Sequence, residues 1–224
     1  FSQVIYNFIN IIIIALVLIS GITPILVQET KIEDYEINSL KMQIYSTVLI
    51  TIQIITTFNN LAITAISKEG REAVLIKYIP LSLYKQFKIK LIPQIVLNTI
   101  MSILVLIVIA INVPKISIWY YIITFITTFI LNIIYSSLLL LIDCKNPNLN
   151  WINQESVVKG GNNKIYKYLI TIIFILIILY FSSVFEKMNF AISVIIINVI
   201  LIVFLILLNK FIKKNINKIF NKIY

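Results

Sequence analysis

The sequence predicts an all-α polytopic membrane protein, a bundle of six transmembrane helices with a cytoplasmic amphipathic helix. Of its 224 residues, 60% are hydrophobic and 12% are charged, whereas soluble domains are about half apolar and a quarter charged. The apolar residues also form six long uncharged runs, and a bilayer core of about 30 Å needs roughly 20 such residues in a helix. The runs exceed the length of barrel strands and lack their strict alternation, which favours helices.

The chain is expected to form a single transmembrane domain over residues 1–224. Its spans follow in order as residues 4–27, 43–66, 91–113, 116–142, 168–185 and 189–209. Only Glu186, Lys187 and Met188 separate the last two spans, which should therefore form a tight helical hairpin. The remaining parts are cytoplasmic loops at residues 67–90 and 143–167 and a basic tail at residues 210–224.

The basic residues predict the orientation. The two loops and the tail hold fifteen of the nineteen Lys and Arg residues, and the alternation of spans puts all three on one side. The positive-inside rule then places both ends of the chain in the cytoplasm of a cell membrane. The abundance of Ile, Asn and Lys, which A/T-rich codons encode, indicates a bacterium with a low-G+C genome.

The net charge of +10 is explained by this topology and by attraction to the lipid bilayer. No basic surface with aromatic platforms is evident, so we expect no nucleic-acid partner. In the tail, Ile212, Ile216, Ile219 and Ile223 share one helical face among lysines. This pattern predicts an amphipathic helix that lies along the inner leaflet.

Several absences exclude whole classes of chemistry. The chain has no His, a single cysteine (Cys144) and no Gly-rich phosphate loop, so we expect no catalytic residue, no metal site and no cofactor. No predicted span contains a charged residue. Intramembrane proteolysis is therefore excluded and proton coupling is disfavoured, although sodium could still be held by carbonyls and hydroxyls.

Polar residues inside the spans have two interpretations. They could line a substrate path or join helix to helix, and the Asn-rich composition favours the second. The residues are Gln53, Asn59, Asn60, Gln94, Asn98, Asn132, Ser136 and Ser137. Pro93 should lie near the N-terminus of its helix, where proline is tolerated.

The sequence of the first cytoplasmic loop predicts a short amphipathic helix, a break and a second helix. Ser67 can cap the first helix and Glu69 suits its positive end, while Pro80 disfavours helix at the preceding residue. Ser82 can cap the helix that enters the third span. One face of the first helix would carry Val74, Leu75, Tyr78 and Ile79. Periodicity alone equally allows a helix that merely lies in the lipid headgroups.

Two motifs in consecutive loops resemble a known family, the exporter permeases of the type-2 class of ATP-binding-cassette transporters. The first loop is similar to the family's Ser-Arg-Glu-Gly-Lys…Leu-Lys-x-Leu-Pro-Ile-Ser signature, with Lys68 and Arg71 exchanging the basic types. It matches at Ser67, Glu69, Gly70, Lys77, Pro80 and Ser82. The second loop resembles the family's Pro-Lys-Leu-Asp-Trp-Glu-Asn-Glu…Val-Lys stretch. It matches at Pro147, Leu149, Trp151, Val158 and Lys159 and departs from it at Asn148, Asn150 and Ile152.

The resemblance implies a membrane-spanning subunit that moves substrate while a separate cytoplasmic ATP-binding subunit hydrolyses ATP. The 67–82 stretch would be a coupling helix, with Glu69 and Lys77 making polar contacts, Gly70 allowing close approach and Pro80 fixing the break. The implied contact residues are Ser67, Glu69, Gly70, Arg71, Lys77, Tyr78, Pro80, Ser82, Pro147, Leu149, Trp151 and Lys159. The chain would be the C-terminal half of a longer permease, paired with the N-terminal half or with a second copy.

Two other functions remain open at the level of sequence. The chain could be a secondary carrier or flippase without an ATPase, or a non-transporting subunit of a membrane complex. An ATPase encoded beside it would favour the exporter. The substrate could be a peptide, a lipid, a drug or an ion.

Overall fold

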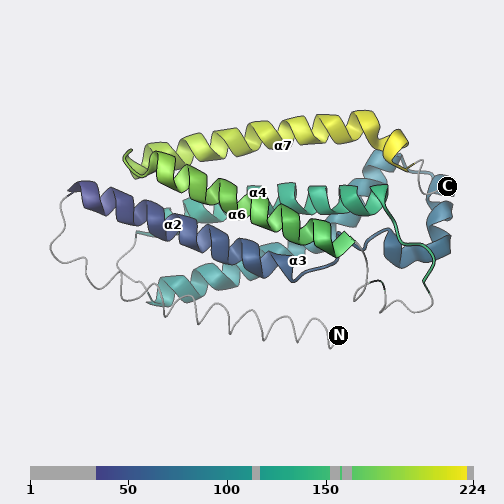
Figure 1. The fold of residues 1–224 in the computed structure, drawn as a ribbon, viewed down its shortest axis with the longest axis horizontal. Helices are drawn as coiled ribbons and strands as arrows, with labels where there is room; N and C mark the ends of the chain where they lie inside the picture. Colours follow the sequence, from purple (N-terminus) through teal and green to yellow (C-terminus); the bar gives the residue numbers. More distant parts are fainter. Residues whose placement is uncertain (1–33, 113–116, 152–156, 158–162, 221–224) are drawn as a thin grey trace.

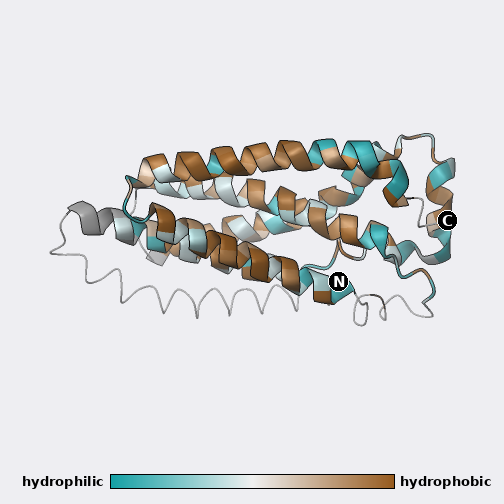
Figure 2. Ribbon diagram, turned by 45° about the horizontal axis from the view of Figure 1, so that its top comes forward, coloured by the Kyte–Doolittle hydropathy of each residue, from teal (hydrophilic) through white to brown (hydrophobic). Residues whose placement is uncertain are grey.

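The computed structural model describes residues 34–112, 117–151, 157 and 163–220, and this part of the chain is helical with no strand. Four of its helices are long and apolar enough to cross a membrane. They are α3 (Leu83–Asn112), α4 (Ile118–Lys145), α6 (Asn163–Phe185) and α7 (Phe190–Phe220). Figure 2 shows their apolar middle stretches and the hydrophilic residues gathered at one end. The protein is a multi-pass membrane protein.

The predicted count of six spans is not confirmed. The first predicted span lies outside the described residues. The second was predicted over residues 43–66, but helix α2 covers Asp34–Thr57 and is not among the four apolar helices. This helix begins nine residues earlier than predicted and also ends nine residues earlier, because the chain turns after Thr57.

The other four predicted spans correspond to α3, α4, α6 and α7, and each of these helices extends past one predicted boundary. α3 begins eight residues before residue 91, so Pro93 lies inside the helix rather than near its N-terminus. α4 continues through Asp143, and α6 begins before Lys167. The predicted spans themselves carry no charged residue, but α4 and α6 each extend to an ionisable residue with a buried side chain, Asp143 and Lys167.

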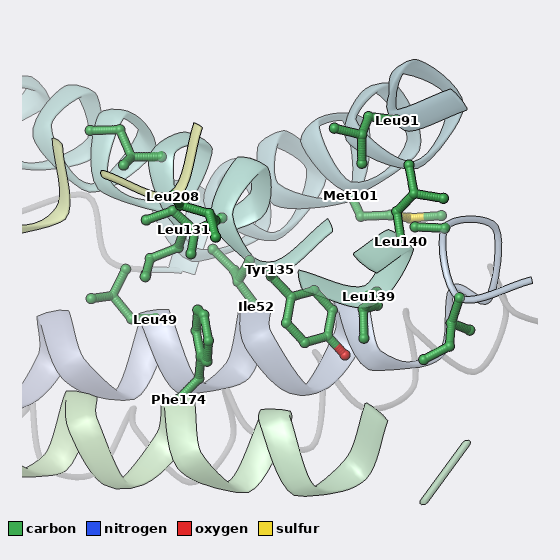
Figure 3. Close-up of a cluster of buried hydrophobic side chains, with 14 of the residues drawn as sticks. Leu49, Ile52, Leu91, Met101, Leu131, Tyr135, Leu139, Leu140, Phe174 and Leu208 are labelled. Atoms are coloured by element: carbon green, nitrogen blue, oxygen red, sulfur yellow. The ribbon is translucent and has the colours of Figure 1, made fainter. Parts of the chain in front are cut away.

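The helices form an elongated bundle in which α4 is the central element (Figure 1). α4 packs against α3 and α7, and α2 packs mainly against α6. Of the most apolar stretch of α4, 67% is buried, compared with 17% for α6 and 22% for α7. The core contains Ile52, Leu131, Tyr135, Leu139 and Phe174, whose side chains meet between α2, α4 and α6 (Figure 3).

The C-terminal part of α7 differs from the predicted surface helix. α7 continues without a break through Phe220, and the described isoleucines of the predicted face are buried in the protein instead of in lipid headgroups. Ile223 lies outside the described residues. Ile212 is fully buried, and Ile216 and Ile219 are 6% and 5% exposed. The lysines of this segment are exposed. The segment is therefore amphipathic, as predicted, but its apolar face packs against the bundle.

One end of the bundle carries most of the lysines, and we call it the basic end. It lies on the right in Figure 1, where α3 and α6 begin and α4 and α7 end. The uncharged stretch of α7 from Phe190 to Asn209 has a length of about 30 Å at 1.5 Å per residue, and Lys210 follows it directly. Lys90, Lys145, Lys167 and Lys210 mark this end on the four helices.

Candidate functional site

The chain between α2 and α3 forms an irregular structure at the basic end, and we call residues 67–82 the surface segment. Turns follow Thr57, and a 3₁₀ helix, η2 (Ser67–Tyr78), then leads to a bend before α3. Gly70 interrupts η2 with φ 57° and ψ −135°, a backbone conformation that residues with a Cβ rarely adopt. The predicted amphipathic α-helix is thus a kinked 3₁₀ helix.

The boundaries of the surface segment agree with two predictions. Ile79, before Pro80, is extended with ψ 128°, as expected for a residue that precedes proline. The hydroxyl of Ser82 accepts a hydrogen bond from the backbone N–H of Lys85 at 3.4 Å, so Ser82 caps α3.

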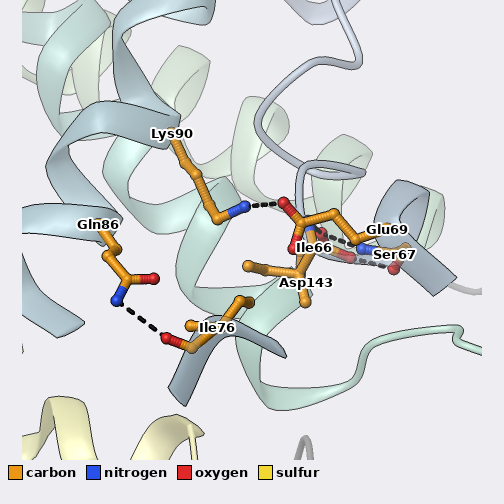
Figure 4. Close-up of polar contacts among 7 residues, drawn as sticks. All are labelled: Ile66, Ser67, Glu69, Ile76, Gln86, Lys90 and Asp143. Carbon is orange, nitrogen blue, oxygen red and sulfur yellow. Dashed lines mark hydrogen bonds and ion pairs between the residues drawn. The ribbon is translucent and has the colours of Figure 1, made fainter. Parts of the chain in front are cut away.

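Ser67 does not cap η2, and Asp143 from α4 performs that role. The carboxylate Oδ2 of Asp143 accepts hydrogen bonds from the backbone N–H groups of Ile66 (2.6 Å) and Ser67 (3.1 Å). These donors stand at the start of the helix, where backbone N–H groups lack intrahelical partners and favour a negative charge. The Ser67 hydroxyl donates to the other carboxylate oxygen (Figure 4).

Asp143 also joins α6 to this cluster. Asn163 Nδ2 donates to Asp143 Oδ1 at 3.3 Å and to the carbonyl of Asn146 at 2.9 Å. The Asp143 side chain is fully buried, so its charge depends on these donors. The neighbouring Lys68 is half-buried. Burial lowers the pKa of Lys68 below its ordinary value, and the negative charge of Asp143 acts in the opposite direction.

The surface segment is tied to α3 by a second set of contacts. Lys90 forms an ion pair with Glu69, and Gln86 donates to the carbonyls of Ile76 (3.0 Å) and Leu81 (2.9 Å) (Figure 4). Glu69 is therefore paired within the protein. Its side chain is 35% exposed, so the polar contact to a partner that the family resemblance implies would compete with Lys90.

The turns at residues 58–66 are held by polar side chains from α3 and α6. Asn59 Nδ2 donates to Asn98 Oδ1 at 3.0 Å, and the N–H of Ala62 donates to Gln94 Oε1 at 2.9 Å. From α6, Lys167 Nζ donates to Asn60 Oδ1 at 2.6 Å. Irregular backbone near membrane depth needs such partners. These bonds favour the interpretation of the span polar residues as links between helices.

The interior of the bundle has further polar links and some polar atoms without a protein partner. Asn132 Nδ2 donates to the Ser102 hydroxyl at 3.0 Å, which joins α4 to α3. Gln53 Nε2, Asn98 Nδ2 and Ser136 Oγ are buried and make no hydrogen bond among the described residues.

The two loops that carry the motifs described in the sequence analysis lie together. Trp151 Nε1 donates to the Ser67 carbonyl at 2.6 Å, and the N–H of Asn148 donates to the Ser67 hydroxyl at 3.0 Å. A Cβ added to Gly70 would lie 3.1 Å from ring atoms of Trp151, so the close approach that Gly70 allows is to this ring. A cleft of about 430 Å³ separates the two stretches, lined by residues 68–72 and 149–151.

The predicted contact residues fall into three groups. Ser67 and Gly70 are buried, and Glu69, Pro147, Leu149 and Trp151 are partly buried. The exposed ones are Arg71, Lys77, Tyr78, Pro80 and Ser82. Lys159 lies outside the described residues. The predicted apolar face is also exposed, with Val74 at 42%, Leu75 at 56%, Ile79 at 44% and Tyr78 at 79%.

Sequence reasoning missed Asp143, Lys167 and Gln86. Asp143 was assigned to the loop because it follows an uncharged run, and Lys167 because it precedes one. The signal that could have found them is their position, since an ionisable residue at the edge of a span can face the bundle interior as well as the headgroups.

The described residues provide no group of three His, Cys, Asp or Glu side chains that could hold a metal ion. Compared with known proteins, the chain matches no family model, no curated protein and no solved structure.

Proposed function

We propose that the chain is the membrane-spanning permease subunit of an ATP-driven exporter. In this proposal the basic end faces the cytoplasm of a bacterial cell membrane, and the surface segment is the coupling helix that binds a separate ATPase subunit. The protein would have no catalytic residues of its own.

One observation carries the proposal: the surface segment presents an apolar face outward while its opposite face is fixed to the bundle. Leu75 and Tyr78 are exposed, whereas Ala73 and Ile76 are buried. The segment lies at the basic end, next to charged Lys85 and Lys88, where the uncharged stretches of the helices have ended. A soluble partner with an apolar groove and an acidic rim would complement this surface.

The association of the two loops supports the same proposal. The two motifs lie in separate loops of the sequence, and the hydrogen bond from Trp151 to the Ser67 carbonyl brings them into one surface. The cleft between them gives a partner a place to insert a side chain.

The test is a photo-crosslinking amino acid at position 78 in native membranes of the source cell. We expect it to capture a soluble nucleotide-binding subunit, and capture to be lost in Pro80→Leu, which changes the bend after Ile79. The same crosslinker at Ile195 of α7, which is 63% exposed, is the matched control and should capture lipid or membrane protein. Capture of lipid alone from position 78 would contradict the proposal.

An ion-coupled carrier is the second candidate, because Asp143 and Lys167 are ionisable groups buried at one end of the helices. The discriminating measurement is substrate efflux from cells treated with a protonophore while ATP is maintained. An exporter powered by ATP continues, and a proton-coupled carrier stops.

A further inference from the structure

We propose that Asp143 is the positioning residue through which a displacement of the surface segment reaches α4 and α6. The inference deepens the proposed function and rests on it only for the source of that displacement, the ATPase subunit. Its structural content concerns residues within this chain.

The start of the surface segment cannot shift without disturbing Asp143. Ile66 and Ser67 give this carboxylate three hydrogen bonds, two from backbone N–H groups and one from a hydroxyl. The side chain is fully buried, so a broken bond would leave a donor or the charge without a partner. The hydrogen bonds are preserved when α4 moves together with the surface segment.

The same carboxylate extends the link to α6. Asn163 reaches Asp143 from the first residue of α6, and its second bond, to the Asn146 carbonyl, joins the end of α4. One turn further along α6, Lys167 holds Asn60 in the turns before the segment. Two residues of α6 are therefore connected to the start of the surface segment and to the turns before it, Asn163 through Asp143 and Lys167 through Asn60.

The links to α3 are of two kinds. The ion pair of Lys90 with Glu69 has side chains that are 18% and 35% exposed, and water weakens a pair at such positions. Gln86 of α3 is 5% exposed and donates to the carbonyls of Ile76 and Leu81. A force applied to the exposed face at Leu75 and Tyr78 should therefore reach α3 through Gln86, and reach α4 and α6 through Asp143.

Cys144 provides a probe that does not involve the ATPase. It is the single cysteine of the chain, it follows Asp143 on α4, and it is fully buried. Its rate of labelling by N-ethylmaleimide in native membranes measures how often the end of α4 opens. Native Cys144 should react slowly, and Asp143→Asn should raise the rate at least about tenfold, because the amide has one acceptor oxygen instead of two and its NH2 group must face either the backbone N–H donors or the Asn163 amide.

The decisive measurement is a double-mutant cycle with Gly70→Ala. This change displaces the surface segment at a position three residues after Ser67. The added Cβ meets Trp151, and the backbone φ of 57° becomes strained. In the native background it should raise the labelling rate of Cys144 about tenfold. With Asn at position 143 the same change should add less than about twofold, since the link is already broken.

Two results would overturn the inference. Gly70→Ala could leave Cys144 labelling unchanged, which would mean that the displacement stops within the segment. It could also multiply the rate equally in both backgrounds, which would mean that Asp143 does not carry it. A purely structural role of Asp143 gives this second result, because independent losses of stability add in free energy.

Two further variants keep the test valid if Asp143→Asn folds poorly. Ser67→Ala removes one bond to the carboxylate together with the acceptor of the Asn148 N–H. In this background Gly70→Ala should raise the labelling rate of Cys144 by less than about tenfold but by more than about twofold. Tyr45→Phe removes the buried bond to Thr127 far from the segment, and the effect of Gly70→Ala should remain about tenfold in that background.

The outcome is distinguishable from that of the crosslink at position 78. If Asp143→Asn removes the effect of Gly70→Ala on Cys144 labelling but no ATPase subunit is captured, the result would support Asp143 as the link and contradict the proposed partner. If the subunit is captured but Gly70→Ala has no effect on Cys144 labelling, or the same effect with Asp or Asn at position 143, the result would support the partner and overturn this inference.

Discussion

The two ends of the bundle are held together by different interactions. At the basic end, the connection between α2 and α3 is irregular, and a buried carboxylate, a buried lysine and several amides satisfy its backbone and side chains. At the opposite end, aromatic rings meet between the helices. Tyr45 packs edge-on against Tyr120 and Phe190, with ring centroids 6.4 and 5.8 Å apart.

The difference shows what each end can do. Aromatic packing tolerates small shifts, because the energy of a ring pair changes gradually with distance and angle. Hydrogen bonds to a buried charge are directional, and a displaced donor is left without water to replace its partner. The basic end is therefore suited to fix one element relative to another, and the opposite end to hold helices together.

The largest effect should follow removal of the carboxylate at the basic end. Asp143→Ala leaves two backbone N–H groups and the Ser67 hydroxyl without their acceptor. We expect the free energy of unfolding to fall by about 3 kcal/mol or more. Denaturation by sodium dodecyl sulfate in mixed micelles measures it. A loss below about 1 kcal/mol would mean that water satisfies these donors and that the ends do not differ as described.

A smaller effect is expected at Gly70. Gly70→Ala should lower the free energy of unfolding by about 2 kcal/mol, since the residue has φ 57° and little space beside Trp151. Trp151→Ala alone removes the ring and its bond to the Ser67 carbonyl. With Ala already at position 151, Gly70→Ala should still cost about 1 kcal/mol, because the backbone strain persists. Complete relief by Trp151→Ala would show that only the contact matters.

The smallest effect should come from the opposite end. Tyr45→Phe keeps the ring cluster and removes the hydroxyl that bonds to Thr127 at 2.7 Å. Side-chain hydrogen bonds between membrane helices average about 0.6 kcal/mol, so we expect a loss of about that size. The same unfolding assay, with Thr127→Val as the partner variant, gives the comparison. A loss equal to that of Asp143→Ala would remove the contrast between the two ends.

Much of the fold could be predicted because membrane helices leave a strong signal. Four of the six expected spans are apolar helices in the structure, and the short hairpin between residues 185 and 190 separates α6 from α7 as expected. Ser82 caps α3, and the chain before Pro80 is extended, because capping and proline geometry depend on neighbouring residues. The exposed apolar face of the surface segment was also predictable.

The role of Asp143 was not predictable in the same way. The acceptor at the start of η2 comes from a residue 76 positions further along the chain than Ser67, and no local rule links the two. The ring that faces Gly70 likewise belongs to Trp151 in the second loop. The sequence motif marks both stretches, but it contains no information on which atoms meet.

Composition and hydropathy are sufficient to show that this protein lies in a membrane, that its described part is helical and which stretches of α3, α4, α6 and α7 are apolar. These properties depend on the composition and periodicity of short stretches, which the bilayer selects directly. The end of α2 at Thr57, the orientation of the α7 isoleucines toward protein and the burial of Asp143 follow from the packing of the helices. Each depends on contacts between distant residues, and these form only when the helices pack.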